Sequence, residues 1–203
     1  GESGDAALSV LIAGVDEAGR GPLAGPVVAA AVILPERMNL EGIDDSKKLD
    51  PALREELALR IRAEAVWAIA EVDAAQIDRD NIFWATMRAM ERAVALLPGA
   101  PSEVWVDGNR VPPGLASIGR AIVDGDALHV CIGAASIIAK CHRDALMRAF
   151  HEQYPQYGFD RHFGYATPEH LAALAEHGPC PIHRRSFAPV RAKEQLCFDL
   201  GES

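Results

Sequence analysis

Apolar residues occur in short runs separated by turn residues, a pattern typical of alternating strands and helices. Residues 10–15 form an apolar segment that leads into a breaker series at 19–22, and residues 26–34 are almost continuously apolar and rich in β-branched side chains. Both segments predict strands, the second one buried on both faces. Shorter segments predicted as strands follow at residues 66–72, 103–107 and 118–123.

Helical spacing of apolar residues appears between and after these strands. Asp50 supplies an N-cap and Pro51 the first helical residue, which predicts a helix over about 51–64. The segment beyond Pro181 is rich in proline and arginine and has no clear assignment. The order of elements predicts an α/β layered fold. Further helices are predicted over residues 73–97, 134–150 and 167–178.

The chain of 203 residues contains no internal repeat and no linker, so we expect one continuous domain. Its longest strictly apolar run, residues 27–34, is far shorter than the roughly 20 residues of a membrane span. The N-terminus lacks the pattern of a secretory signal. The four cysteines, Cys131, Cys141, Cys180 and Cys197, form no C-x-x-C pair, which favours reduced thiols in a cytoplasmic protein with no membrane partner.

Charge by itself argues against a nucleic-acid partner. The chain has 29 acidic and 20 basic residues, a formal net charge of −9, and this field opposes any polyanion. The opposition is reversed locally if several carboxylates gather around divalent cations, because bound metals invert the local charge.

Acidic residues follow the predicted strands at four positions. Asp16 and Glu17 close the first strand, Asp107 closes a later one, and Asp126 lies just beyond another. If those strands are neighbours, the carboxylates repel one another, and an oxygen-preferring cation such as Mg²⁺ or Mn²⁺ relieves the repulsion. Adjacent residues of a regular strand face opposite sides, so Asp16 and Glu17 share one site only at a strand end. The alternative is that these acids are ordinary turn and loop charges, as the Asp-Gly pair at Asp107 allows.

The residues around these acids form separate blocks in one order along the chain, from about residue 12 to 190, and together they closely resemble ribonuclease HII. Any one block alone is a weak match, and the ordered set is specific. Two later segments, Glu176 to Pro179 and His183 to Phe187, look like the bacterial members of that family. The main blocks are Gly14 to Pro26, Asp45 to Leu49, Val106 to Arg110, Ala135 to Lys140 with Arg143 and Asp144, and Gly164-Tyr165 with Thr167.

This resemblance implies a ribonuclease H-like α/β fold, a mixed five-stranded sheet flanked by helices with a C-terminal helical extension. In the single domain of residues 1–203, about 10–150 would form the core and about 151–203 the extension and tail. It further implies an endoribonuclease that hydrolyses the RNA strand of RNA–DNA hybrids and incises 5′ of single ribonucleotides in duplex DNA. Two Mn²⁺ or Mg²⁺ ions would act per site and leave 5′-phosphate and 3′-hydroxyl ends.

By resemblance, the metal ligands and catalytic residues fall on Asp16, Glu17, Asp107 and Asp126. Asp144 is the rival for the fourth ligand; we prefer Asp126 and expect Asp144 to pair with Arg143 or Lys140. Asp124 stands where bacterial relatives often carry a lysine, and its added negative charge bears on metal affinity or substrate contact.

Residues implied to contact the substrate fall into three groups. Gly19, Arg20 and Gly21 match the tripeptide that senses the ribose 2′-hydroxyl, with a simple tight turn as the alternative. Tyr165 matches the tyrosine that packs on the following sugar, with a buried structural tyrosine as the alternative. Ser46 and Ser136 either bind phosphate or cap local backbone. Candidates for phosphate contacts, against an alternative of solvated surface charge, are Lys47, Lys48, Lys140, Arg143, Arg184 and Arg185.

The remaining features leave other hypotheses open. The histidines show no metal-ligand spacing and are expected to be structural. Residues 195–200 loosely resemble peptides that dock on the bacterial sliding clamp, although a packed tail explains them too, and we expect a monomer. Rival functions are a non-catalytic nucleic-acid-binding module and a metal phosphatase acting on small phosphate esters. The second leaves the Gly19–Gly21 turn and Tyr165 without a purpose.

Overall fold

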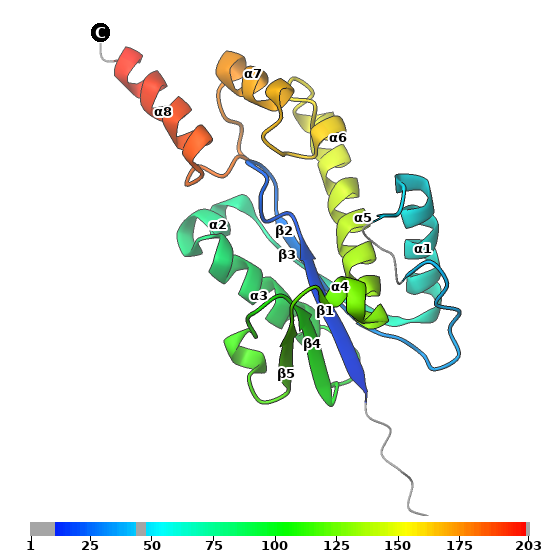
Figure 1. Cartoon of the computed structure of the whole chain (residues 1–203). Helices are drawn as coiled ribbons and strands as arrows, with labels where there is room; N and C mark the ends of the chain where they lie inside the picture. Colours follow the sequence, from blue (N-terminus) through cyan, green and yellow to red (C-terminus); the bar gives the residue numbers. More distant parts are fainter. Residues whose placement is uncertain (1–10, 44–47, 202–203) are drawn as a thin grey trace, which may run out of the picture.

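A computed structural model describes residues 11–43 and 48–201 and shows a mixed sheet with strand order β3-β2-β1-β4-β5 (Figure 1). β1 pairs antiparallel with β2 and parallel with β4; β2–β3 is antiparallel and β4–β5 parallel. The strands predicted at 66–72 and 103–107 are confirmed with the same bounds. The five strands are β1 Ile12–Ala18, β2 Val27–Ile33, β3 Val66–Val72, β4 Glu103–Asp107 and β5 Gly119–Ile122.

Capping side chains fix where several helices begin. The Asp50 carboxylate accepts the Leu53 N–H at 2.9 Å, and Asp73 accepts the N–H of Gln76 at 2.8 Å. The first of these confirms the helix predicted over 51–64. The helices are α1 Pro51–Glu64, α2 Ala74–Asp80, α3 Ile82–Ala95, α4 Gly125–Leu128, α5 Val130–Gln153, α6 Phe159–His162, α7 Pro168–His177 and α8 Ala188–Gly201, with a 3₁₀ turn at Pro113–Leu115.

The prediction of one helix over 73–97 is wrong, because the chain breaks at Asn81. This residue has a φ of 72°, outside the helical range, so it ends α2. Its side chain then caps α3 by accepting the Trp84 N–H at 3.0 Å. An apolar period does not reveal such a break, because the spacing continues on both sides of it.

Helices cover both faces of the sheet. α3 packs on one face, where Val15 and Val104 meet Met90 in a buried apolar cluster. α1 and α5 pack on the other (Figure 1), and α5, at 24 residues, is longer than the predicted 134–150. A β-carbon at Gly14 would lie 2.2 Å from the Cys131 carbonyl carbon, so glycine lets the start of α5 approach β1.

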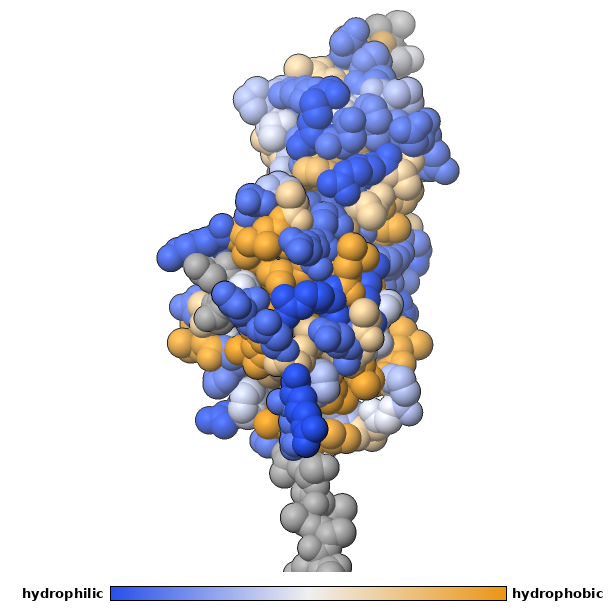
Figure 2. All heavy atoms as spheres, turned by 90° about the vertical axis from the view of Figure 1, so that its right-hand side faces the viewer, coloured by the Kyte–Doolittle hydropathy of each residue, from blue (hydrophilic) through white to orange (hydrophobic). Residues whose placement is uncertain are grey.

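The C-terminal third forms the expected helical extension. Met147 of α5 packs with Tyr157 and Phe159 in a cluster of its own. α8 extends away from the body (Figure 1) and is anchored through Val190, which packs on Leu23 and Leu174. Seen from the α1 side, hydrophilic residues dominate this upper end of the molecule, while apolar patches are more frequent below (Figure 2). None of the described helices is long and apolar enough to cross a membrane.

Candidate active site

Asp16 and Glu17 lie inside β1, which continues to Ala18 and does not end before them. This agrees with the prediction that the two acids close the first strand and that a turn follows them. Pairing with β2 continues to Ala18, whereas pairing with β4 stops at Val15 opposite Val106. The acids thus occupy the stretch of β1 that is no longer covered by β4 on that edge. They also lie within three residues of the end of β1, the strand end that a shared site requires.

Asp107 and Asp126 meet at the same edge of the sheet. Asp107 is the last residue of β4, and its Oδ1 accepts the backbone N–H of Asp126 at 3.2 Å. Asp126 lies in the short helix α4 and is buried. Asp124 is the N-cap of that helix, exposed and in the left-handed conformation with a φ of 55°.

Burial and mutual repulsion shape the electrostatics of this edge. The pKa of Asp16 is raised well above its ordinary value, first by burial and then by the charges of Glu17 and Asp107. Burial also raises the pKa of Glu17, which the nearby Arg20 guanidinium partly counteracts. The Arg20 Nη1 lies 3.8 Å from the Glu17 Oε1, while Oε2 is buried without a hydrogen-bond partner. The acids therefore interact, and a positive charge among them would stabilise their ionised forms.

A hollow of about 380 Å³ opens at Glu17 and Asp107, between the strand ends and Phe83 and Met87 of α3. Within residues 11–43 and 48–201, no three acidic, histidine or cysteine side chains are close enough together to hold an ion as placed. The chemistry nevertheless fits a divalent cation. The donors are all carboxylate oxygens, two have raised pKa values, and Glu17 Oε2 lacks a partner.

Asp144, the rival fourth ligand, lies on α5 and is buried. Its Oδ1 lies 3.4 Å from the Lys140 Nζ, which confirms the expected pairing with Lys140. The backbone N–H of Asp126, by contrast, donates to the Asp107 carboxylate and brings Asp126 to the edge that carries the other acids. This geometry favours Asp126 as the fourth acid of the site.

The Gly19–Gly21 turn and Tyr165 lie against each other. A β-carbon at Gly21 would be 3.7 Å from the Tyr165 Cε1, and the Leu23 N–H donates to the Gly164 carbonyl at 2.8 Å. Tyr165 is 39% exposed. The Lys140 Nζ lies 5.9 Å from the centre of its ring. Tyr165 is therefore no buried structural tyrosine, and its ring is available beside the turn.

Arg143 does not reach a phosphate as predicted, because it is only 2% exposed. Its Nε, Nη1 and Nη2 donate to the carbonyls of Pro26, Phe163 and Ala24 at 2.9, 2.7 and 2.9 Å. A β-carbon at Gly19, where φ is +90°, would lie 2.0 Å from the Arg143 Nε. Arg143 thus fastens the turn to the segment that carries Tyr165.

Arg184 is also buried, at 0% exposure, so its predicted phosphate contact is wrong as well. The guanidinium donates from Nε to the Gly25 carbonyl and from Nη1 to those of Arg20 and Pro22, each at 2.9 Å. Its Nη2 donates to the Gly19 carbonyl at 2.5 Å. Burial lowers the pKa of Arg184 to about 9, so it stays charged at neutral pH. Arg184 therefore fixes the Gly19–Gly21 turn from its buried side.

The other predicted contacts differ in accessibility. Lys48 is exposed, Lys140 and Ser136 are half-buried, and Arg185 is half-exposed in an ion pair with Glu194. Ser46 and Lys47 lie outside the described residues. Cys131, Cys141 and Cys180 are free thiols.

A buried group of histidines lies close to this surface, although the sequence does not assign it to the site. His162, His170 and His183 interact with one another and with the backbone near Tyr165. Their spacing of eight and thirteen residues is unlike any metal motif, so the sequence predicts only their structural character.

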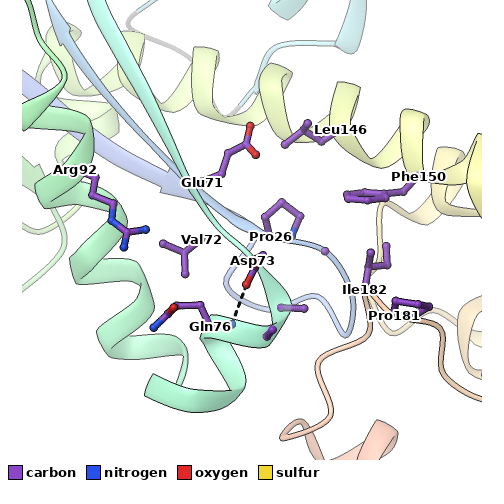
Figure 3. Close-up of a pocket in the computed structure, with 13 residues that line it drawn as sticks. Pro26, Glu71, Val72, Asp73, Gln76, Arg92, Leu146, Phe150, Pro181 and Ile182 are labelled. Carbon is purple, nitrogen blue, oxygen red and sulfur yellow. Dashed lines mark hydrogen bonds between the residues drawn. The ribbon is translucent and has the colours of Figure 1, made fainter.

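A separate hollow of about 480 Å³ lies between the end of β3, the start of α2 and α5 (Figure 3). Glu71, Leu146 and Ile182 line it, and none of the four acids does. It lies apart from the site.

The family model for ribonuclease HII matches residues 13–190. The chain belongs to the ribonuclease HII family. Ribonuclease HII of Idiomarina loihiensis is 57% identical over 182 residues, 89% of this chain and 97% of that protein. Ribonuclease HII of Thiobacillus denitrificans is 60% identical over 183 residues, 90% of this chain and 89% of the relative. Membership makes the protein a metal-dependent endoribonuclease, a ribonuclease H, whose substrate is RNA-containing nucleic acid.

Solved structures agree with this assignment. Ribonuclease H2 from Pyrococcus horikoshii superposes with a TM-score of 0.77 at 28% identity, covering 91% of this chain and 97% of that one. The PCNA:RNase HII complex from Archaeoglobus fulgidus matches with a TM-score of 0.76 at 28% identity, covering 88% and 96%. These matches confirm the expected ribonuclease H-like fold.

Proposed function

We propose that this ribonuclease HII hydrolyses the RNA strand of RNA–DNA hybrids and also incises 5′ of single ribonucleotides in duplex DNA. The products carry 5′-phosphate and 3′-hydroxyl ends. The observation that supports this proposal is the contact between the Gly19–Gly21 turn and Tyr165, near the edge that carries Asp16 and Glu17. A turn and an aromatic ring side by side suit recognition of a ribose, whereas a small phosphate ester needs neither.

Asp16, Glu17, Asp107 and Asp126 would hold two Mn²⁺ or Mg²⁺ ions. When bound, such ions activate a water molecule and stabilise the leaving 3′ oxygen. The carboxylates contribute negative charge that is costly without a cation, because burial and repulsion raise the pKa values of Asp16 and Glu17. Arg20 balances part of the charge on Glu17.

The backbone of the turn reads the 2′-hydroxyl in this proposal. Arg184 draws the carbonyls of Gly19 and Arg20 inward. In a trans peptide the N–H points opposite to the C=O, so the N–H groups of Arg20 and Gly21 point away from Arg184, and both residues are exposed. Two adjacent outward N–H donors suit an oxygen acceptor of the sugar or its phosphate. Tyr165 supplies a flat face for the next sugar and a polar hydroxyl.

Phosphate contacts hold the duplex without reading its sequence. Lys48, Lys140 and Arg185 keep this proposed role, since each is at least partly accessible. Ser136 stays a candidate, as do Ser46 and Lys47, which lie outside the described residues. Arg143 and Arg184 do not contact phosphate in this proposal; they support substrate binding by holding the Gly19–Gly21 turn.

Mapping of cleavage on duplex DNA with one ribonucleotide tests the proposal, with Mg²⁺ and Mn²⁺ compared. We expect incision 5′ of the ribonucleotide, loss of cleavage in Asp16→Asn with binding retained, and reduced discrimination in Tyr165→Phe. Binding without cleavage in any metal would support the non-catalytic module. Turnover of a simple phosphate ester but not of the duplex would support the phosphatase.

We propose further that the protein is a cytoplasmic monomer whose single domain ends in an extension over about 151–203. Residues 195–200 belong to α8, which extends from the body (Figure 1), and this position supports a weak contact with a sliding clamp. A structural relative comes from a PCNA:RNase HII complex. Removal of residues 195–203 should abolish binding to the bacterial clamp on a sensor surface and leave cleavage of short duplexes unchanged. Undiminished clamp binding would contradict this role.

A further inference from the structure

Three hydrogen bonds run in series from Cys180 to the backbone of Tyr165. The Cys180 N–H donates to His183 Nδ1 at 2.9 Å, and His183 Nε2 lies 2.9 Å from His170 Nε2. His170 Nδ1 lies 2.8 Å from the Tyr165 carbonyl oxygen. The two histidines are 0% and 1% exposed, so water does not complete these contacts.

The Cys180 N–H, the first donor of this series, fixes which ring nitrogen carries the proton on each histidine. A backbone N–H only donates, so His183 Nδ1 accepts and the ring carries its proton on Nε2. That proton is donated to His170 Nε2, which leaves the proton of His170 on Nδ1. His170 therefore donates to the Tyr165 carbonyl. Burial lowers the pKa of both histidines, that of His183 to about 3, which keeps both rings neutral as this pattern requires.

A third histidine restricts the His170 ring. His162 stacks on it with centroids 4.4 Å apart and planes 6° from parallel. His162 is itself held, because its Nδ1 accepts the Gly164 N–H at 3.1 Å and its Nε2 lies 2.6 Å from the Tyr157 carbonyl. The His170 ring has little freedom to turn, so its Nδ1–H has a set direction.

His183 also belongs to the segment that supports the Gly19–Gly21 turn. It forms a bridge with Ala24, and the Arg184 N–H donates to the Leu23 carbonyl at 2.8 Å. Neighbouring residues of an extended segment point their side chains to opposite sides. Accordingly His183 reaches toward Tyr165 through His170, while Arg184 holds the turn. The dipeptide His183-Arg184 thus supports both the Gly19–Gly21 turn and Tyr165.

We propose that His170, oriented by His183, is a positioning residue that fixes Tyr165 against Gly21 and thereby sharpens selection of a single ribonucleotide. This inference rests on the proposed function, because it assigns a support to the tyrosine of that same site. His170 does not touch substrate; it acts through the Tyr165 carbonyl.

Two substitutions at position 170 separate the two hydrogen bonds of the ring. In His170→Asn the amide nitrogen replaces Nδ1 and retains donation to Tyr165, while the contact with His183 is lost. In His170→Gln the longer side chain replaces Nε2 and retains the contact with His183, while donation to Tyr165 is lost. Each variant loses one buried hydrogen bond, so urea unfolding should show similar losses of stability.

The decisive readout is the ratio of kcat/KM on a duplex with one ribonucleotide to kcat/KM on a uniform RNA–DNA hybrid. We expect His170→Gln to lower this ratio about 3–10-fold, the equivalent of one net hydrogen bond, and His170→Asn to retain it. A merely structural role would lower both activities together and leave the ratio unchanged. A similar ratio in the two variants therefore overturns the inference.

The ring protons give a second readout that does not depend on activity. Nitrogen-15 NMR of the histidine side chains should show the Nδ1–H form for His170 and the Nε2–H form for His183. The variant His183→Asn lacks the Nε2–H donor that faces His170. We therefore expect its His170 signal to show a mixture of the two tautomers. The opposite tautomer in the native protein would refute the series.

Failure of this inference and failure of the proposed function give different results. If the native protein selects the single ribonucleotide and Tyr165→Phe reduces that selection, the proposed function stands whatever the His170 variants do. If the native protein does not cut the duplex with one ribonucleotide, the proposed function itself falls.

Discussion

Gly21 lies against the ring of Tyr165, so that a β-carbon on the glycine would stand 3.7 Å from the tyrosine Cε1. The two residues are far apart in sequence, and buried side chains hold the backbone on each side of the contact. Arg184 binds the turn, Arg143 binds both segments, and His170 binds the Tyr165 carbonyl. The geometry of this contact therefore depends on residues that are not exposed to substrate.

Replacement of Arg184 by glutamine should destabilise the protein strongly. It leaves buried carbonyls of the turn without donors, and we expect a loss of about 3–5 kcal/mol in the free energy of unfolding. Arg185→Gln is the matched control, because Arg185 is half-exposed and its side chain pairs only at the surface with Glu194. Urea unfolding measures both. Equal losses in the two variants would show that the inward hydrogen bonds are unimportant.

Replacement of Asp16 by asparagine should stabilise the metal-free protein while it abolishes cleavage. The substitution removes a buried charge that repels Glu17 and Asp107, and we expect a gain of about 1 kcal/mol. Turnover should fall by at least about 100-fold, more than the loss typical of residues that only support a ligand. Thermal melts of the native protein should shift upward with Mn²⁺, and those of Asp16→Asn much less. A metal shift of the same size in both would remove Asp16 from the ligand set.

Acid should destabilise the fold through the buried histidines. The pKa values of His170 and His183 are lowered in the folded state, so their contribution is complete above the unfolded value near 6.5 and is lost as pH falls below it. For each histidine, the free energy of unfolding falls by about 1.4 kcal/mol per pH unit below that point, until the pH reaches the folded pKa. Asp16 and Glu17 act in the opposite sense, because their raised pKa values favour the folded state at low pH.

Urea midpoints between pH 8 and pH 4 test this balance. We use Asp16→Asn for the series, since it removes the largest opposing carboxylate. A midpoint that rises steadily from pH 6.5 to pH 4 would contradict the role of the histidines.

Replacement of Gly14 by alanine should disrupt the contact between β1 and α5. The added β-carbon would lie 2.2 Å from the Cys131 carbonyl carbon, backbone that moves only with the helix, so we expect a loss of about 3 kcal/mol or more. Gly99→Ala is the control, because nothing lies within 4 Å of a β-carbon there. Melting temperatures of the two variants should differ by several degrees, and similar values would argue against close packing at Gly14.

Local signals in the sequence predict much of the fold. The Asp50-Pro51 pair marks the start of α1, and apolar runs give β3 and β4 with their observed bounds. The break at Asn81 has no such signal, because a single residue with positive φ leaves the apolar period intact. The breaker residues after Ala18 mark the end of β1 behind Asp16 and Glu17, but the approach of Asp126 to Asp107 depends on tertiary packing that the sequence does not reveal.

The arginines show a different limit. Arg143 and Arg184 look like surface cations in the sequence, since an arginine is rarely buried without an acidic partner. Their acceptors are instead backbone carbonyls more than 100 residues away along the chain for most of the bonds. Carbonyl oxygens carry no signature in a sequence, so burial of this kind becomes visible only in three dimensions.

The anchoring of α8 separates two properties of the C-terminal end. The first turn of α8 attaches the helix to the body, because Val190 packs on Leu23 and Leu174 there. The rest of the helix extends outward (Figure 1). Farther along the helix, Leu196 and Leu200 are 58% and 76% exposed, so substitutions at these two positions disturb little packing. Changes at these exposed positions can alter what the helix presents to a neighbouring molecule while the anchor at Val190 is kept.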